Sequence, residues 1–261
     1  MEEWKLKEVG KRLGFSLKEL KNIQWLAVGP FQKVEIEELS PLKLPRRLQK
    51  KIEGVWIKHL QDHPYDFPGP LVSISEIEVK GEILHLAVRR TNYKTYIGTR
   101  WKRKRRKLDL AQKPLDRNFP LPLSIGAVTT TKDDKIVIEI RGKVGLGKGL
   151  TNTLPSGYFD PHKDLSWQDC ILREMREELG IESNFIRSLK VLGLILDCKI
   201  SQQPLLAVDM QVEVESEGII PREDEIAKLG FLENSMETVR RWRHPWTPHS
   251  IGKLILHFAL S

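Results

Sequence analysis

The sequence predicts an α/β (α+β) fold: a main domain built on a mixed sheet, preceded by a smaller α+β region. Short, β-rich apolar runs alternate with amphipathic segments of helix length, which is the pattern of a mixed α and β chain. The stretch 108–122 contains three prolines and little apolar periodicity. We therefore expect an N-terminal region over residues 1–115 and a main domain over 116–261.

The first half is predicted to hold two helices and three strands. Apolar residues recur at roughly helical spacing in the first 20 residues and again over 48–60. Residues 33–38 alternate apolar and charged, and β-rich runs on either side of the Lys80-Gly81 turn form a further pair of strands. A proline-rich turn, residues 63–70, follows the second helix.

The second half is denser in strands and contains the clearest helix. Apolar runs predict strands over 123–130, 136–140, 189–196 and 205–214, and the last two helices over 236–242 and 250–260. Ser166 and Asp169 form a start similar to a capping box, and Gly180 ends the helix of residues 166–179. The glycine-rich stretch 142–149 is interpreted as a flexible connection, because no strand leads directly into it and no helix follows.

Composition favours a soluble, cytoplasmic protein. The chain carries 43 Lys+Arg against 35 Asp+Glu, and 40% of its residues are hydrophobic. No apolar run approaches the roughly 20 residues that span a bilayer, and the N-terminus lacks an apolar signal region. Cys170 and Cys198 are far apart and form no disulfide framework, so we expect a reducing compartment. Cys170 is expected to be a small buried residue rather than a nucleophile.

The densest basic cluster, residues 101–107, has three interpretations. A solvated strand end or loop is favoured first, and an anion-attracting rim near a phosphate site second. Nucleic-acid binding comes third, because no aromatic platform accompanies the charges. The scattered histidines form no zinc pattern; His249 is expected to cap the last helix, with a place near a ligand as the alternative.

Three carboxylates on the central helix are the strongest functional signal. Glu174, Glu177 and Glu178 are spaced three and four apart, so they share one face of the helix, and Arg173 lies beside them. Carboxylates alone also fit a solvated face. A hard divalent cation gives a reason to gather them, because Mg²⁺ prefers oxygen ligands and binds through a few carboxylates and substrate phosphates.

The surrounding pattern turns this signal into a family resemblance. Residues 173–181 read Arg-Glu-apolar-X-Glu-Glu-X-Gly-apolar, which resembles the helical half of the Nudix box, and Gly157 stands where that family has its loop glycine. The resemblance implies an α/β/α sandwich and a Mg²⁺-dependent hydrolase, with Mn²⁺ as an alternative ion. It implies that Glu174, Glu177 and Glu178 bind metal, that the Gly157 carbonyl adds a ligand, and that Arg173 orients the glutamates.

The sequence also departs from the usual box. The loop from Gly157 to Arg173 is about two residues longer, and the usual double glycine reads Ser156-Gly157. The intermediate glutamate has no clear counterpart, Asp164 being the nearest acid. These departures concern the loop rather than the metal face.

Further segments resemble the UDP-sugar branch of the family over most of the chain after about residue 50. They are residues 66–70, 91–101, 155–161 and 247–256. This resemblance implies a nucleoside-diphosphate-linked substrate, best a UDP-sugar split into UMP and sugar 1-phosphate. Phe67 and Tyr93 would flank the base, with ordinary packing between the halves as the equal alternative. Arg141 would contact phosphate, and Tyr158 and Asp160 would complete the site, Tyr158 standing where the branch has histidine.

Other expectations stay open. Glu225, with Glu223 second, is the candidate base that orients or deprotonates water. The alternatives to a UDP-sugar hydrolase are a catalytically inactive Nudix-fold module that binds a nucleotide or partner, and a hydrolase of capped RNA or other nucleotides. Family members are often dimers, so a homodimer is an expectation, whereas nucleic acid and membrane partners are not favoured.

Overall fold

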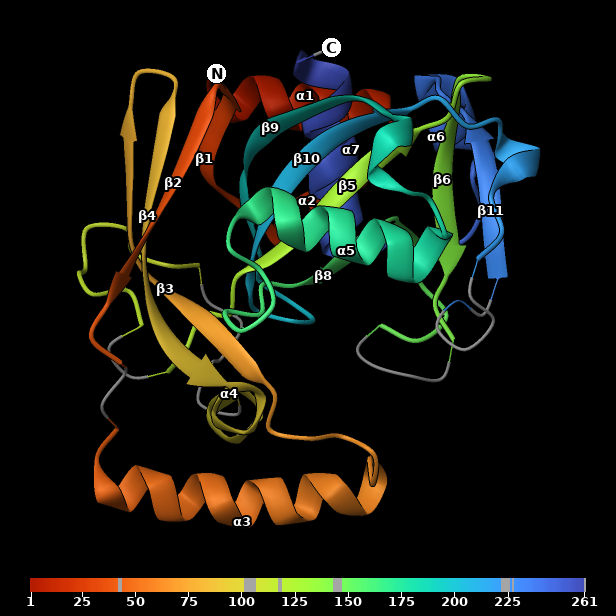
Figure 1. Cartoon of the computed structure of the whole chain (residues 1–261). Helices are drawn as coiled ribbons and strands as arrows, with labels where there is room; N and C mark the ends of the chain where they lie inside the picture. Colours follow the sequence, from red (N-terminus) through yellow and green to blue (C-terminus); the bar gives the residue numbers. More distant parts are fainter. Residues whose placement is uncertain are drawn as a thin grey trace.

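The chain forms two sheets of unequal size with helices around them (Figure 1). A computed structural model describes residues 1–41, 44–100, 107–116, 119–142, 147–221, 226 and 228–260. The predicted base Glu225, its alternative Glu223 and most of the basic cluster, residues 101–106, lie outside the described residues.

The larger sheet has eight described strands in the order β1-β9-β10-β5-β6-β11, with β7 paired to β6 and β8 paired to β5. Strands β5 and β10 run parallel, whereas the other pairs are antiparallel, so the sheet is mixed as predicted. The strands are β1 (Ile23–Phe31), β5 (Ser124–Thr130), β6 (Lys135–Ile140), β7 (Thr151–Thr153), β8 (Ser156–Tyr158), β9 (Ile186–Asp197), β10 (Pro204–Val212) and β11 (Lys228–Glu233).

Helices cover both faces of this sheet, which gives the expected α/β/α layers. Leu194 of β9 packs in one core with Met175 of α5 (Trp167–Leu179). The next residue, Ile195, points to the other face and packs with Leu254 of α7 (Pro248–Leu260). This alternation is what a strand buried on both faces requires. Helices α1 (Glu3–Arg12), α2 (Leu17–Leu20) and α6 (Met236–Arg241) lie on the α7 side, and short 3₁₀ turns occur at Ser183–Phe185 and Ser216–Gly218.

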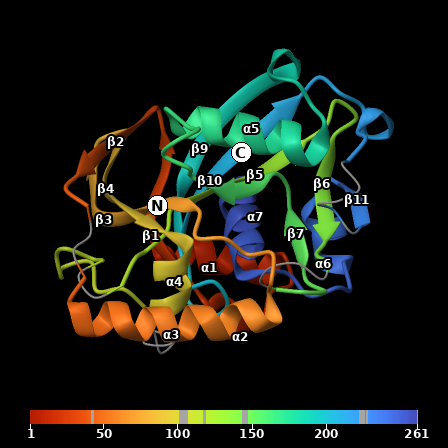
Figure 2. The same ribbon diagram turned by 60° about the horizontal axis from the view of Figure 1, so that its bottom comes forward.

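The smaller sheet has the order β2-β4-β3 and carries two helices. Its strands are β2 (Lys33–Leu39), β3 (Pro70–Lys80) and β4 (Ile83–Asn92), and its helices are α3 (Arg46–Asp62) and α4 (Tyr93–Arg100). Figures 1 and 2 show α3 on the outer side of α4. The two helices touch closely at Gly98, where an added Cβ would lie 2.6 Å from Cγ2 of Ile52.

The first 31 residues pack with the second half of the chain. Strand β1 pairs antiparallel with β9, and Leu6 of α1 shares a core with residues of α7. A domain boundary at 115/116 therefore remains a proposal, and the three-stranded sheet begins only after β1. The segment 107–116 and 119–123 is an ordered connection, since Leu121 and Leu123 are fully buried.

Most predicted helices and strands occur within a few residues of their expected bounds. Strands β1, β7, β8 and β11 and helix α4 were not predicted, and the single helix expected in the first 20 residues is two helices, α1 and α2. In the described part of the chain, no helix is both long and apolar enough to cross a bilayer.

Candidate active site

The position of the acidic face of helix α5 is determined by the residues that cap the two ends of the helix and by the apolar side chains that pack into the core. The Ser166 hydroxyl accepts a hydrogen bond from the backbone N–H of Asp169, which caps the first turn. Gly180 adopts a left-handed conformation (φ 67°) that ends the helix, as predicted. Ile171, Met175 and Leu179 are buried beneath. The three glutamates lie on another face of the helix and are partly buried.

Arg173 links the carboxylates of this face. Its Nη1 donates to Glu174 (2.6 Å) and Glu177 (3.0 Å). Its Nε and Nη2 donate to the two oxygens of Asp164, each at 2.9 Å, and Nη2 also donates to the Tyr158 carbonyl. These carboxylates raise the pKa of Arg173, with Asp164 as the main cause. Arg173 therefore links Glu174, Glu177 and Asp164, and Asp164 holds Arg173 by the two-point geometry that favours arginine.

Gly157 lies directly against the glutamates. A Cβ built on Gly157 would stand 1.9 Å from Oε1 of Glu174, so no side chain fits there while Glu174 keeps its place. The backbone N–H of the neighbouring Ser156 donates to Oε2 of Glu178 at 3.0 Å. Burial, and then the nearby Glu174 carboxylate, raise the pKa of Glu178 well above its usual range. Strand β8 and helix α5 thus form one unit around two carboxylates.

The oxygen donors of this unit fit a hard divalent cation. Glu174, Glu177 and Glu178 share a face, and the backbone of Gly157 approaches without a side chain in between. Two carboxylates this poorly solvated are stabilised by a cation. Within the described residues, however, no three His, Cys, Asp or Glu side chains are already gathered as a metal cluster. Glu174 and Glu177 both accept hydrogen bonds from Arg173.

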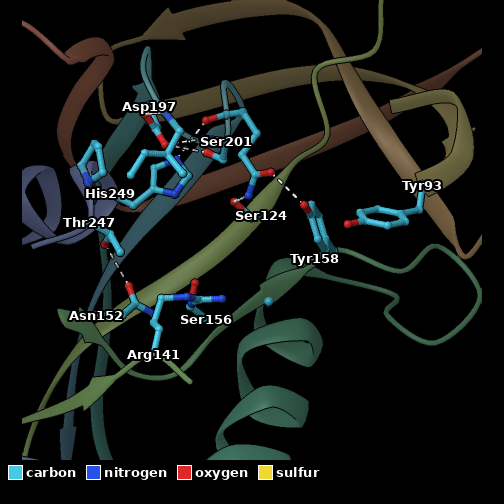
Figure 3. Close-up of a pocket in the computed structure, with 14 residues that line it drawn as sticks. Tyr93, Ser124, Arg141, Asn152, Ser156, Tyr158, Asp197, Ser201, Thr247 and His249 are labelled. Atoms are coloured by element: carbon cyan, nitrogen blue, oxygen red, sulfur yellow. Dashed lines mark hydrogen bonds between the residues drawn. The ribbon is translucent and has the colours of Figure 1, made fainter. Parts of the chain in front are cut away.

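A cavity of about 180 Å³ opens next to Gly157 (Figure 3). Hydroxyls, carboxamides and one arginine dominate its wall. The lining residues are Tyr93, Ser124, Arg141, Asn152, Ser156, Gly157, Tyr158, Asp197, Ile200, Ser201, Gln203, Thr247, Pro248 and His249.

The wall on the β9–β10 side is built by a capped turn. The Asp197 carboxylate accepts the backbone N–H groups of Lys199, Ile200 and Ser201 and the Ser201 hydroxyl, at 2.7–2.9 Å. Both carboxylate oxygens of Asp197 are therefore engaged by the turn. These hydrogen bonds to the carboxylate stabilise the turn that forms this part of the wall. The turn places Ser201 and the following Gln203 at the cavity.

Helix α4, which belongs to the smaller sheet, closes the same cavity. Tyr93 lines it, and burial raises the pKa of Tyr93 to about 12. The Tyr96 hydroxyl donates to the Ser201 carbonyl. Gln203 lies within hydrogen-bond distance of both the Tyr96 and Tyr158 hydroxyls through its Oε1, and its Nε2 donates to Ser124. The N-terminal region thus contributes directly to the pocket.

Five of the predicted site residues surround the junction of the cavity and α5. Arg141, Gly157 and Tyr158 line the cavity, as does Tyr93, while Arg173 reaches the Tyr158 carbonyl from the helix. Glu174 lies against Gly157, and Glu178 accepts the backbone N–H of the neighbouring Ser156. The structure therefore brings the glycine loop, the acidic helix and most of the proposed binding residues together.

Two predicted binding residues lie elsewhere. The Phe67 side chain is 70% exposed and does not line this cavity. Asp160 is also absent from the lining; its Oδ1 accepts the backbone N–H of His162. A role for either in binding remains a prediction.

Sequence reasoning missed several residues of the site. Gln203 and Glu139 follow no motif: Gln203 stands just before β10, and the pairing of β6 with β7 sets Glu139 opposite Asn152. His249, in contrast, was singled out from the sequence as a cap of the last helix, with a place near a ligand as the alternative. It lines the cavity, its Nε2 donates to the Gln203 carbonyl, and burial lowers its pKa. The length of α7 was predicted, but the fully buried Lys253, which donates to the Ala127 and Thr153 carbonyls, was not singled out.

No protein-family model and no curated protein matches the sequence. Several solved structures resemble the chain. The protein DR0079 from Deinococcus radiodurans is 14% identical, with a TM-score of 0.34 over 42% of this chain and 65% of that one, just under two thirds. A MutT protein from Methanosarcina mazei Go1 is 17% identical, with a TM-score of 0.37 over 53% and 92% of the two chains. The Nudix domain of Shewanella oneidensis NrtR, solved with ADP-ribose, is 15% identical, with a TM-score of 0.40 over 53% and 88%.

Nudix hydrolases are among these neighbours. At such identities and TM-scores, the likeness assigns neither an activity nor a substrate to this chain. The functional argument therefore depends on the geometry of the site.

Proposed function

We propose that the protein is a metal-dependent Nudix-type hydrolase that cleaves the diphosphate bond of a nucleoside-diphosphate-linked substrate. One observation supports this proposal above the others: Gly157 approaches Glu174 so closely that any side chain would displace the carboxylate. A solvated acidic helix face has no need of such an approach. Such a close approach is required when a backbone carbonyl and carboxylates coordinate the same ion.

In this proposal Glu174, Glu177, Glu178 and the Gly157 carbonyl hold Mg²⁺ or Mn²⁺. A divalent cation bound there would neutralise charge on the phosphate oxygens and make a nearby water more acidic. Arg173 orients Glu174 and Glu177 and is itself held by Asp164. Glu225 remains the proposed base.

The cavity beside Gly157 is the proposed place of the nucleotide or sugar. Arg141 is the arginine on its wall and the proposed phosphate contact, and both oxygens of the Asp197 carboxylate accept hydrogen bonds from the turn. Its many hydroxyl and carboxamide groups suit a ligand rich in hydrogen-bonding groups. A UDP-sugar, split into UMP and sugar 1-phosphate, is the first candidate, with Tyr93, Tyr158 and Arg141 as binding residues.

The decisive test is turnover by the purified protein with Mg²⁺ and a panel of NDP-sugars, dinucleotides, NTPs and capped RNA, with Glu178→Gln as the matched variant. Release of UMP from UDP-glucose that disappears in the variant supports the proposal in full. Hydrolysis of another panel member keeps the mechanism and discards the UDP-sugar assignment. Tight nucleotide binding with no turnover of any compound would replace the proposal by a binding module.

A further inference from the structure

Glu139 is a buried carboxylate behind the wall of the cavity, in contact with the lining residues Arg141 and Asn152, and no sequence motif identifies it. It lies on β6, and its side chain is 7% exposed. Its Oε1 accepts hydrogen bonds from Nη1 of Arg141 (3.3 Å) and Nδ2 of Asn152 (3.2 Å). A buried carboxylate is costly unless it is paired, so these two partners account for its presence.

Asn152 holds this carboxylate in a fixed place. It lies on β7 directly opposite Glu139 in the strand register. Its Oδ1 accepts from the hydroxyls of Ser250 (2.7 Å) and Thr247 (3.2 Å) at the start of α7; Figure 3 shows the contact to Thr247. Because Oδ1 takes both hydroxyls, Nδ2 is the atom left to face Glu139, and the Glu139 side chain is anchored to the body of the larger sheet.

The Arg141 guanidinium has a hydrogen-bond partner at one end. Glu139 binds only Nη1, and Nε is buried without a hydrogen-bond partner among the described residues. A buried donor with no partner is unfavourable. The Nε and Nη2 edge of a guanidinium is the edge that binds two oxygens of a phosphate or carboxylate together. Arg141 also lines the cavity, so an anionic oxygen pair of a ligand there would satisfy the orphaned donor.

We infer that Glu139 is a positioning residue that fixes Arg141, so that the free Nε–Nη2 edge receives a phosphate group of the ligand in the cavity. The inference rests on the proposed function for the identity of the ligand. Glu139 acts through Arg141: it touches neither the ligand nor the reacting phosphorus. Asn152 supports it from the opposite side.

Binding measured without metal tests this role apart from turnover. UMP and UDP-glucose are titrated calorimetrically, in EDTA, into the wild-type protein and into Arg141→Lys, Glu139→Ala and Glu139→Gln. Uridine, which lacks phosphate, is titrated into the same four proteins, so that the contribution of the phosphate contact to affinity is separated from that of the nucleoside. We expect Arg141→Lys and Glu139→Ala each to weaken UMP and UDP-glucose roughly tenfold, as loss of a charged hydrogen bond would. Uridine affinity should not change, and Glu139→Gln, which keeps the acceptor oxygen, should recover most of the affinity.

The double variant Glu139→Ala with Arg141→Lys is the critical comparison. If Glu139 acts through Arg141, the double variant binds UMP no more weakly than Arg141→Lys alone. Additive losses, equal losses with uridine, or unchanged UMP affinity in Glu139→Ala would each overturn the inference. Glu139→Gln that binds UMP normally but loses Mg²⁺-dependent turnover would also overturn it, since Glu139 would then be a metal ligand or base. Absence of turnover in wild type contradicts the proposed function and leaves this binding test valid.

Discussion

Replacing Gly157 by alanine is expected to abolish Mg²⁺-dependent hydrolysis while the protein still folds. The added Cβ would lie 1.9 Å from Oε1 and 2.0 Å from Cδ of Glu174, whereas such contacts are not found below 3.0 Å. The carboxylate must therefore move by at least about 1.1 Å (3.0 minus 1.9). Because a glutamate side chain can rotate, the displacement falls on the site rather than on the backbone.

The size of the effect follows from this displacement. A shift of about 1 Å in a catalytic group can cost on the order of 100-fold in rate. Turnover of whichever panel compound the wild-type protein hydrolyses, followed at saturating Mg²⁺, should fall by at least that factor. Mn²⁺ affinity, measured by calorimetry, should fall in parallel, because Glu174 is a proposed ligand.

Gly54→Ala is the matched control. Gly54 lies exposed in the middle of α3 and has no atom within 4 Å of the added Cβ. Alanine there should leave turnover unchanged and stabilise the helix by about 0.5–1 kcal/mol. If Gly157→Ala keeps turnover within a fewfold of wild type and binds Mn²⁺ normally, the close approach has no catalytic purpose and our reading of the site is wrong.

Three further substitutions test the supports of the site. Asp164→Ala removes the buried partner of Arg173 and should lower the free energy of unfolding in urea by about 3 kcal/mol; a loss below about 1 kcal/mol would show that the pair is dispensable. Gly98→Ala would bring a Cβ within 2.9 Å of the Cα of Ile52, so it should separate α3 from α4 and cost about 1–3 kcal/mol in the same assay, whereas unchanged stability would mean that the two helices can slide apart freely. Burial lowers the pKa of Lys253 to about 7 from 10.5. The unfolded chain therefore binds more protons above pH 7, and this group makes stability rise by roughly 1.4 kcal/mol per pH unit between pH 7 and 9; Lys253→Met should lose that slope, and an unchanged slope would contradict the assignment.

The acidic face of α5 could be predicted because its information is local. Spacing of three and four residues determines which side chains share a helix face, and the cap residues Ser166 and Gly180 mark its ends. The layered fold followed for the same reason, since each long strand carries its own apolar pattern.

Strands and helices whose buried residues do not follow a regular period along the sequence were not predicted. In β1 the burial pattern does not alternate, because the register shifts between Trp25 and Ala27 and again between Val28 and Phe31. Strand β11 is short and only one of its residues is buried. In α4 the four consecutive residues Tyr96 to Thr99 are all buried, so burial does not follow a helical period there.

The cavity could not be predicted, because its wall joins residues that only tertiary pairing brings together. Tyr158 and Gln203 are 45 positions apart, and Asn152 and Thr247 are 95 positions apart. Glu139 and Asn152 meet through the short pairing of β6 with β7, which leaves little trace in a three-residue strand. Even a correct list of strands would not have supplied these neighbours.

The pairing of β1 with β9 constrains when the protein can fold during synthesis. The partner of β1 begins at Ile186, so about 155 residues (186 minus 31) must be translated after β1 ends before the two strands can meet. At ribosomal rates of about 5–20 residues per second, β1 waits roughly 8–30 s with its hydrogen-bonding groups unpaired. During that time its apolar residues are exposed, so the nascent chain is expected to need protection from other strands, whereas the β2–β4–β3 unit can already close.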